Sequence, residues 1–347
     1  MWIRWPIPKD DAIAATAMMT VGIIGMSINT YVFIGVRRAT THFGYAFGNL
    51  CLSHTVANLG IASMYTIFVG PVTLLVPEFH RTYWGERFGQ ILILFWNGAV
   101  FSHLLIAINR CVRMYKPVFY EKIFTRFFTI FSIGLAWFLA FCQVFSYFWE
   151  ECTFGFVPHK YSFEFADRPC SYYIGYIFDY YMSICMICTI ASLDFCTFLK
   201  IRKFKKVGVS TTHSATEYLK NPAAMRRIRD VRFFFQTVVQ GMAFMAELVS
   251  FFSISTLFDN NKWAHFGFTT IAWIGVHTID GCIVVIFNRE VRKAVGFLCI
   301  EPSPEPQKQM PNTTTVNTKS MYRNVTMIER TVFERDAMEC EYAENHL

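Results

Sequence analysis

The sequence predicts an all-α membrane protein, a bundle of seven transmembrane helices with the N-terminus outside the cell. Seven apolar runs are each long enough to cross a bilayer, which takes about 20 helical residues. Only 16% of the 347 residues are charged and 54% are hydrophobic, whereas a soluble domain carries roughly 25% charged residues. Lysine and arginine are concentrated in alternate connections between the runs, as is typical of connections that face the cytosol.

The apolar runs follow one another along a single membrane domain, residues 1–300. The third run is the clearest, because it has no charged side chain from Gly89 to Asn109 and is followed at once by Arg110 and Arg113. After the seventh run, apolar residues recur at positions i, i+4 and i+7, which predicts a short amphipathic helix on the membrane surface. The predicted spans are approximately residues 12–36, 44–76, 88–111, 123–148, 172–199, 233–258 and 263–287, with the amphipathic helix at 288–299.

The orientation follows from the distribution of basic residues within residues 1–300. The side with the connections after the first, third, fifth and seventh runs holds 20 lysines and arginines, including Arg110 and Arg126 at the ends of the adjoining runs, and the opposite side holds 7. The positive-inside rule therefore places the N-terminus outside and the C-terminus in the cytosol. Residues 301–347 are rich in proline, threonine and acidic residues, which predicts a disordered cytoplasmic tail. Cys299, just before this tail, is a candidate for palmitoylation, with a free reduced thiol as the equal alternative.

Several classes of function have no support in the sequence. It contains no H-E-x-x-H, G-x-S-x-G or P-loop motif and no paired metal-ligand spacing, so we expect neither an enzyme nor a metal or other cofactor. The basic residues lie in short connections between apolar runs, and the lipid bilayer explains them without a nucleic-acid partner. The first three runs are not repeated by the last three, which disfavours repeat-built transporters.

Four acidic residues lie inside the apolar runs. Placing an ionisable group in a membrane costs free energy, so each of these residues is a candidate for a functional role. Asp179 and Glu247 lie in the predicted outer half and are candidates for contact with a ligand. Asp194 and Asp280 lie in the inner half and are candidates for packing or for a conformational switch. The alternative for each is a protonated or hydrogen-bonded carboxyl that only joins neighbouring helices.

Two further sets of residues share helix faces. Trp96 and Arg110 lie on one face of the third run, with Trp96 and its neighbour Asn97 in the outer half as further ligand candidates. A face of this kind could link a pocket to a cytosolic surface, and the alternative is that Trp96 is simply part of the core. His277 and Asp280 are three residues apart and share a face of the seventh run, which suggests a His–Asp pair, with a role in packing alone as the alternative.

Cys152 and Cys170 bracket the longest predicted outer loop, residues 149–171. That compartment is oxidising, so we expect the two thiols to form a disulfide. A bridge that closes a loop of this length contributes about 3 kcal/mol by the chain-entropy relation.

The residues at the end of the third run resemble those of G-protein-coupled receptors. The triplet 109–111, Asn-Arg-Cys, stands where rhodopsin-like receptors have Asp-Arg-Tyr, and Pro117 follows at the matching offset. Trp137 is similar to the tryptophan of their fourth helix, and Asp280-Gly281 stands where the seventh helix usually has Asn-Pro. The resemblance implies that Arg110, with Asn109, Pro117 and Asp280 as further switch candidates, couples the bundle to a cytosolic G protein.

A closer resemblance is to the nematode serpentine receptor class X, a family of chemoreceptors. Residues 102–111 and 120–124 are similar to that family's signature, and residues 287–292 agree with the end of its seventh helix. The resemblance covers about residues 12–299. The sequence departs from the wider superfamily in having no cysteine at the outer start of the third run and no proline in the sixth.

The resemblance implies a chemosensory receptor in the plasma membrane, with a sensory cilium as a candidate compartment. A small-molecule or peptide ligand would bind between the helices from outside, and a heterotrimeric G protein would bind at the cytosolic side. The alternative that we carry is a ligand-gated channel or transporter of seven helices.

Overall fold

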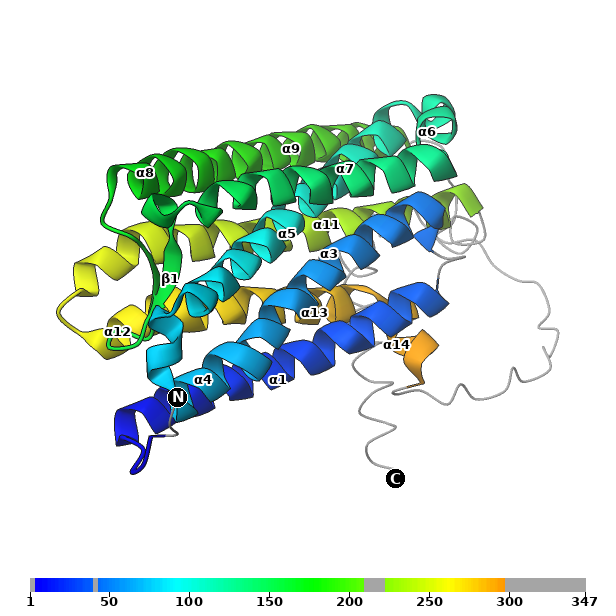
Figure 1. Cartoon of the computed structure of the whole chain (residues 1–347). Coiled ribbons are helices and arrows are strands. Elements are labelled where there is room, and N and C mark those ends of the chain that lie inside the picture. The colour runs from blue at the N-terminus through cyan, green and yellow to red at the C-terminus, as the bar shows by residue number, and fades with distance from the viewer. Residues whose placement is uncertain (1–3, 40–42, 209–221, 297–347) are drawn as a thin grey trace, which may run out of the picture. The chain divides into compact units, whose positions relative to one another are not determined.

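A computed structural model describes residues 4–39, 43–208 and 222–296 of the chain. The described residues up to Ala294 form one compact unit. Seven helices of the described residues are long and apolar enough to cross a membrane, which confirms the predicted seven-helix bundle (Figure 1). The elements of the first three spans are α1 (Lys9–Arg38), α3 (Tyr45–Ser63), η1 (Met64–Val69), α4 (Gly70–Leu75), η2 (Pro77–Arg81) and α5 (Tyr83–Tyr115).

The remaining elements complete the bundle and its connections. A short helix α6 (Pro117–Ile123) precedes the fourth span, and Thr125 then caps α7 by accepting a hydrogen bond from the amide of Phe128. The fourth helix therefore begins at Arg126, three residues later than its predicted start at residue 123. The further elements are α7 (Arg126–Phe145), η3 (Ser146–Phe148), η4 (Glu150–Cys152), β1 (Phe154–Val157), β2 (Ser162–Phe165), α8 (Pro169–Tyr172), η5 (Tyr173–Tyr181), α9 (Met182–Gly208), α11 (Pro222–Val249), η6 (Ser250–Ile254), η7 (Ser255–Phe258), α12 (Lys262–Phe266), η8 (Gly267–Ile271), α13 (Ala272–Phe287) and α14 (Arg289–Val295).

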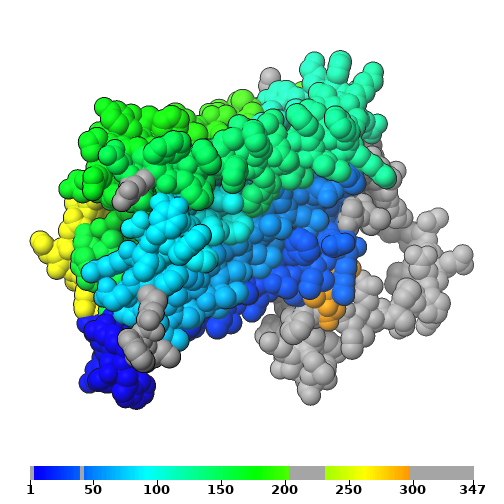
Figure 2. Space-filling model, viewed as in Figure 1, coloured from blue at the N-terminus to red at the C-terminus, as the bar shows by residue number. Residues whose placement is uncertain are grey.

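Helix α5 is the centre of the bundle. It contacts α3, α7, α9 and α11, and it crosses between α3 and α7 in Figure 1. Within its most apolar stretch, 67% of the residues are buried, against 28% for α7. Helix α7 instead lies along one face of the molecule (Figure 2), where Phe127, Ile130 and Phe138 are exposed. Exposed aromatic and aliphatic side chains of this kind fit a surface that faces lipid.

The strands β1 and β2 form an antiparallel hairpin that closes one end of the bundle, which we call the hairpin end. Phe154 pairs with Phe165 and Phe156 pairs with Phe163 across the two strands. Because alternate residues of a strand point to the same face, these aromatic rings gather on the side that packs into the helices, and Phe154, Phe156 and Phe163 are buried. Sequence reasoning treated residues 149–171 as a loop and did not predict this hairpin.

Several contacts fix the hairpin to the bundle. A disulfide joins Cys152 to Cys170, with 5.0 Å between their Cα atoms, at the base of the hairpin. The hydroxyl of Tyr161 donates to Asp11 of α1 (2.6 Å), and the carbonyl of Tyr161 accepts from Thr270 of η8 (2.7 Å). Next to Asp11, Asp10 forms an ion pair with Lys262. These contacts connect the N-terminal helix, the hairpin and the last spanning helix.

The opposite end of the bundle, which we call the Arg110 end, has its own apolar cluster. The rings of Phe43, Phe47 and Phe233 pack together there, with centroid distances from 4.9 to 5.8 Å. Helix α14 closes this cluster, because its Val291 is fully buried in it. The carbonyl oxygen of Ala294 accepts a hydrogen bond from Arg38 at the end of α1 (3.2 Å).

His80 in η2 is expected to make the stability of the folded protein depend on pH. It lies in the connection between two spans, its side chain is buried, and its ring packs 4.5 Å from that of Phe156. Burial lowers the pKa of His80 from 6.5 to about 4. Between these two pH values the unfolded chain binds a proton that the folded chain excludes, so the free energy of unfolding falls as the pH drops from 6.5 to 4. The full effect is on the order of 3 kcal/mol.

We therefore expect the His80→Gln variant to lose less thermal stability than the wild type on acidification from pH 7 to pH 4. The measurement is the unfolding temperature of both proteins in detergent across this range. The difference between the two curves isolates His80 from the other histidines. Parallel curves would show that His80 is already accessible to protons in the folded protein.

Candidate functional site

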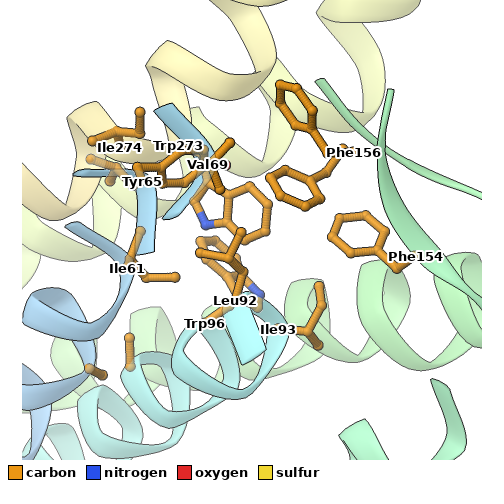
Figure 3. Packing of buried hydrophobic residues seen from close by; sticks show 14 of the residues in the cluster. Ile61, Tyr65, Val69, Leu92, Ile93, Trp96, Phe154, Phe156, Trp273 and Ile274 are labelled. Carbon is orange, nitrogen blue, oxygen red and sulfur yellow. The ribbon is translucent and has the colours of Figure 1, made fainter. Parts of the chain in front are cut away.

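A cavity of about 30 Å³ lies beneath the hairpin, between α5, α11, η5, η6 and α13. Its walls are mainly aromatic. In Figure 3, Trp96 of α5, Trp273 of α13 and Phe154 of β1 lie close together at the hairpin end of the core. The indole rings of Trp96 and Trp273 meet edge to face, with 6.3 Å between their centroids. The lining residues are Ile93, Trp96, Phe154, Phe165, Asp179, Glu247, Leu248, Phe251, Phe252 and Trp273.

Three of the four ligand candidates from the sequence meet at this cavity. Trp96, Asp179 and Glu247 come from three different helices and all line it. Asp179 lies in the π-helical segment η5, and the π-helical segment η6 begins three residues after Glu247. Such segments occur frequently at functional sites, because the extra residue in a turn redirects the side chains. The fourth candidate, Asn97, is buried in α5 but is not a lining residue.

Asp179 is held by residues of the neighbouring helix. Its carboxylate accepts a hydrogen bond from Gln143 of α7 (2.6 Å) and another from the hydroxyl of Tyr147 in η3. The carbonyl of Tyr147 in turn accepts from Arg87 (2.8 Å) and Gln90 (2.5 Å) of α5. A carboxylate with two donors in a buried site is compensated for the loss of water. Asp179 therefore joins the fourth and fifth spans at the edge of the cavity.

Asp280 lies at the centre of a buried polar network. Its Oδ2 atom is 3.0 Å from Nε2 of His54 and accepts a hydrogen bond from Asn58 (2.6 Å). Asn58 also bonds Nδ1 of His277 (2.7 Å) through its carbonyl oxygen, and Asn29 of α1 donates to the backbone carbonyl of His277 (3.0 Å). All five side chains are at most 3% exposed. The network joins α1, α3 and α13 in the middle of the bundle.

The predicted pairing of His277 with Asp280 is wrong. Both lie on one face of α13, but His277 bonds Asn58, and the histidine that bonds Asp280 is His54 of α3. A helical repeat shows only which residues share a face and not which residues of another helix face them. His54 and Asn58 are four residues apart in the second apolar run, and this spacing was the one available sign of a common partner.

Packed aromatic and histidine side chains connect the cavity to the polar network. The ring of Phe244 in α11 lies 5.7 Å from Trp96, 5.4 Å from His277 and 5.8 Å from His54. Phe244 also meets His103 of α5 at 6.0 Å, edge to face. A displacement of Trp96 by a ligand would therefore press on Phe244 and on the histidines of the network, because close-packed interiors transmit displacement.

Arg110 lies at the other end of α5, buried against α11 and α3. Its Nη1 atom donates to the hydroxyl of Thr237 (3.3 Å), and its guanidinium lies 4.8 Å from the ring centroid of Phe47 and 5.3 Å from that of Phe233. The carboxylate of Asp194 in α9 interacts electrostatically with Arg110. The acidic residue near Arg110 is thus Asp194, which comes from another helix. The residue that precedes Arg110 in the sequence, Asn109, carries no charge.

Asn109 and Pro117 have separate roles in the structure. The amide of Asn109 donates to the hydroxyl of Tyr120 in α6 (3.3 Å), so it holds the connection that follows α5. Pro117 is the first residue of α6, where its missing N–H removes no helical hydrogen bond. Trp137 donates to Ser53 (3.0 Å) and so joins α7 to α3. The palmitoylation candidate Cys299 lies outside the described residues.

The comparisons with known proteins agree with this architecture. The family of serpentine type 7TM GPCR chemoreceptors Srx matches residues 19–288. Serpentine receptor class X 45 of Caenorhabditis elegans is 27% identical over 310 residues, which cover 83% of this chain and 82% of the relative. Serpentine receptor class X-43 of the same organism is 24% identical over 295 residues, which cover 82% of this chain and 86% of the relative. The chain therefore belongs to the Srx family of serpentine seven-transmembrane chemoreceptors and is an integral membrane receptor.

Proposed function

We propose that this receptor binds a small ligand in the cavity beneath the hairpin and activates a heterotrimeric G protein at the Arg110 end. The observation that carries the proposal is that α5 holds Trp96 at the cavity and Arg110 at the opposite end of the bundle. At 1.5 Å per residue, these two positions are about 21 Å apart along one helix. One rigid element therefore contacts both the ligand cavity and the surface that would meet the transducer.

The contacts of Arg110 suggest how the inactive arrangement is held. Arg110 joins α5 to Thr237 of α11 and is covered by Phe47 and Phe233. In this arrangement the guanidinium is buried and is not available to another protein. A ligand that binds better to an arrangement in which α5 and α11 separate would expose Arg110 and shift the population toward it.

The proposed placement has the hairpin end outside the cell and the Arg110 end in the cytosol of the plasma membrane. The excess of lysine and arginine in the connections at the Arg110 end supports this orientation. The disulfide at the hairpin end also fits the oxidising side. A sensory cilium is the compartment that a chemosensory role would favour.

An epitope tag at residue 1 tests the orientation. We expect an antibody to reach the tag on intact cells that express the full chain. A tag at residue 347 is the control and should become accessible only after permeabilisation. An N-terminal tag that is reached only in permeabilised cells would overturn the orientation, and with it the assignment of Arg110 to the cytosol.

Asn109 offers a test of the inactive arrangement. Replacement by aspartate places a carboxylate beside Arg110, adds to the negative charge that Asp194 already supplies, and should stabilise the buried arginine. We expect Asn109→Asp to lower basal signalling in cells that express the receptor with a promiscuous G protein. Tyr120→Phe, which removes only the hydroxyl that Asn109 bonds, is the control for the α6 contact. Unchanged or raised basal activity in Asn109→Asp would count against a role for this pair in the off state.

A further inference from the structure

The two carboxyl groups at the cavity differ in how they are bonded. Asp179 has two donors, Gln143 and Tyr147. Glu247, in α11, is only 6% exposed, yet within the described residues no hydrogen bond and no ion pair reaches its carboxyl group. Burying a carboxylate without a partner is costly, so a group retained in this state is a candidate for contact with something that enters the cavity.

The surroundings of Glu247 favour a positively charged partner. The cavity-lining residues include no lysine, arginine or histidine. Trp96 and Trp273 present indole rings beside Phe251, and the faces of such rings attract ammonium groups, most strongly when water is excluded. A cation in the cavity would therefore lie beside one unpaired carboxyl group and several aromatic side chains.

Other ligand classes fit the cavity less well. A carboxylic acid would meet Glu247 and Asp179 with no basic side chain on the lining to compensate its charge. A purely apolar compound would leave Glu247 buried without a partner. The volume of about 30 Å³ also limits the ligand in this arrangement to a small head group, so a larger molecule must displace aromatic side chains such as Phe251 and Phe252.

We infer that the receptor recognises a small protonated amine, whose ammonium group pairs with Glu247 and packs against the rings of Trp96 and Trp273. This inference rests on the proposed function, because it assumes that the cavity beneath the hairpin is the ligand site. It assigns different roles to the two acids. Glu247 contacts the ligand, and Asp179 positions the fourth and fifth spans.

Binding is measured as the change in unfolding temperature of the full chain in lipid nanodiscs. The probes are trimethylamine and isoamylamine, with isoamyl alcohol and isovalerate as the neutral and acidic counterparts of the second amine. We expect an amine to raise the unfolding temperature and its alcohol and acid counterparts to leave it unchanged. Glu247→Gln, which keeps the shape and removes the charge, should weaken amine binding roughly 100-fold. Glu78→Gln, at an exposed position of the same end, should leave amine binding unchanged.

Guanine-nucleotide exchange on an added G protein, measured in the same nanodiscs, separates this inference from the proposed function. Amine binding that depends on Glu247 without any exchange supports the ligand class and overturns the transducer role. Exchange stimulated equally in wild type and Glu247→Gln by the alcohol or the acid overturns the ligand class and leaves the receptor role standing. Absence of binding by both amines at millimolar concentration also overturns the inference, as does amine binding lost in Asp179→Asn but kept in Glu247→Gln.

Discussion

Replacing Asp280 with alanine is expected to destabilise the bundle by about 3–5 kcal/mol, the usual cost of removing one member of a buried charged pair. The substitution leaves Nε2 of His54 and the amide of Asn58 without their shared acceptor, in a site from which water is excluded. It also weakens the connection between α3 and α13, which the network supplies in the middle of the bundle. The loss should appear as a much lower unfolding temperature in detergent and reduced surface expression.

Ile279→Ala is the matched control, because Ile279 precedes Asp280 on α13 and is 51% exposed. Asp280→Asn adds a second comparison, since it keeps an acceptor for Asn58 while removing the charge. We expect the order of stability to be wild type and Ile279→Ala, then Asp280→Asn, then Asp280→Ala. A loss in Asp280→Ala no larger than that in Ile279→Ala would show that the network does not hold the helices together.

The second large effect is expected at Arg110. Arg110→Ala should reduce ligand-stimulated G-protein activation by roughly 100-fold or more, as truncation of a central arginine in a protein interface typically does. We expect surface expression to remain, because the substitution removes a buried charge, while Thr237 loses a hydrogen-bond donor and Asp194 loses a nearby positive charge. Signalling is measured in cells at matched surface levels, with Lys116→Ala, an exposed residue just after α5, as the control.

Thr237→Val distinguishes a switch from a purely structural contact at Arg110. Valine has nearly the shape of threonine but cannot accept the hydrogen bond from the guanidinium. If this bond helps to hold α5 against α11 in the inactive arrangement, basal signalling should rise in Thr237→Val while it falls in Arg110→Ala. Equal loss of signalling and of surface expression in both variants would assign Arg110 to packing alone.

The helices of this protein were predictable because lipid imposes a strong pattern on sequence. A span such as α5 must avoid charge over about 20 residues, and Arg110 marks the end of this uncharged stretch, although the helix itself continues to Tyr115. Asp179 and Glu247 were candidates from sequence because ionisable groups inside apolar runs are rare, and Trp96 was one because it shares a helix face with Arg110. All three line the cavity. Whether they meet at one cavity depends on how three helices are rotated relative to one another. The periodicity of one helix carries no information about that rotation.

The partners of the buried acids were not predictable for the same reason. His54 and Asp280 are 226 positions apart, and nothing local to either residue selects the other. The hairpin was missed because each strand has only four residues, with phenylalanine at alternate positions in a segment that also carries loop residues. Its aromatic face becomes recognisable only when the helices provide a surface to bury it.

The most direct test of the account is guanine-nucleotide exchange by the purified receptor in nanodiscs, with a heterotrimeric G protein as the only added protein. The account predicts that the wild-type chain accelerates exchange, that Thr237→Val accelerates it further without ligand, and that Arg110→Ala does not accelerate it. Exchange that is the same with wild type, Arg110→Ala and empty nanodiscs would contradict it. An ion current across a bilayer that contains only the wild-type chain would then favour a seven-helix channel instead.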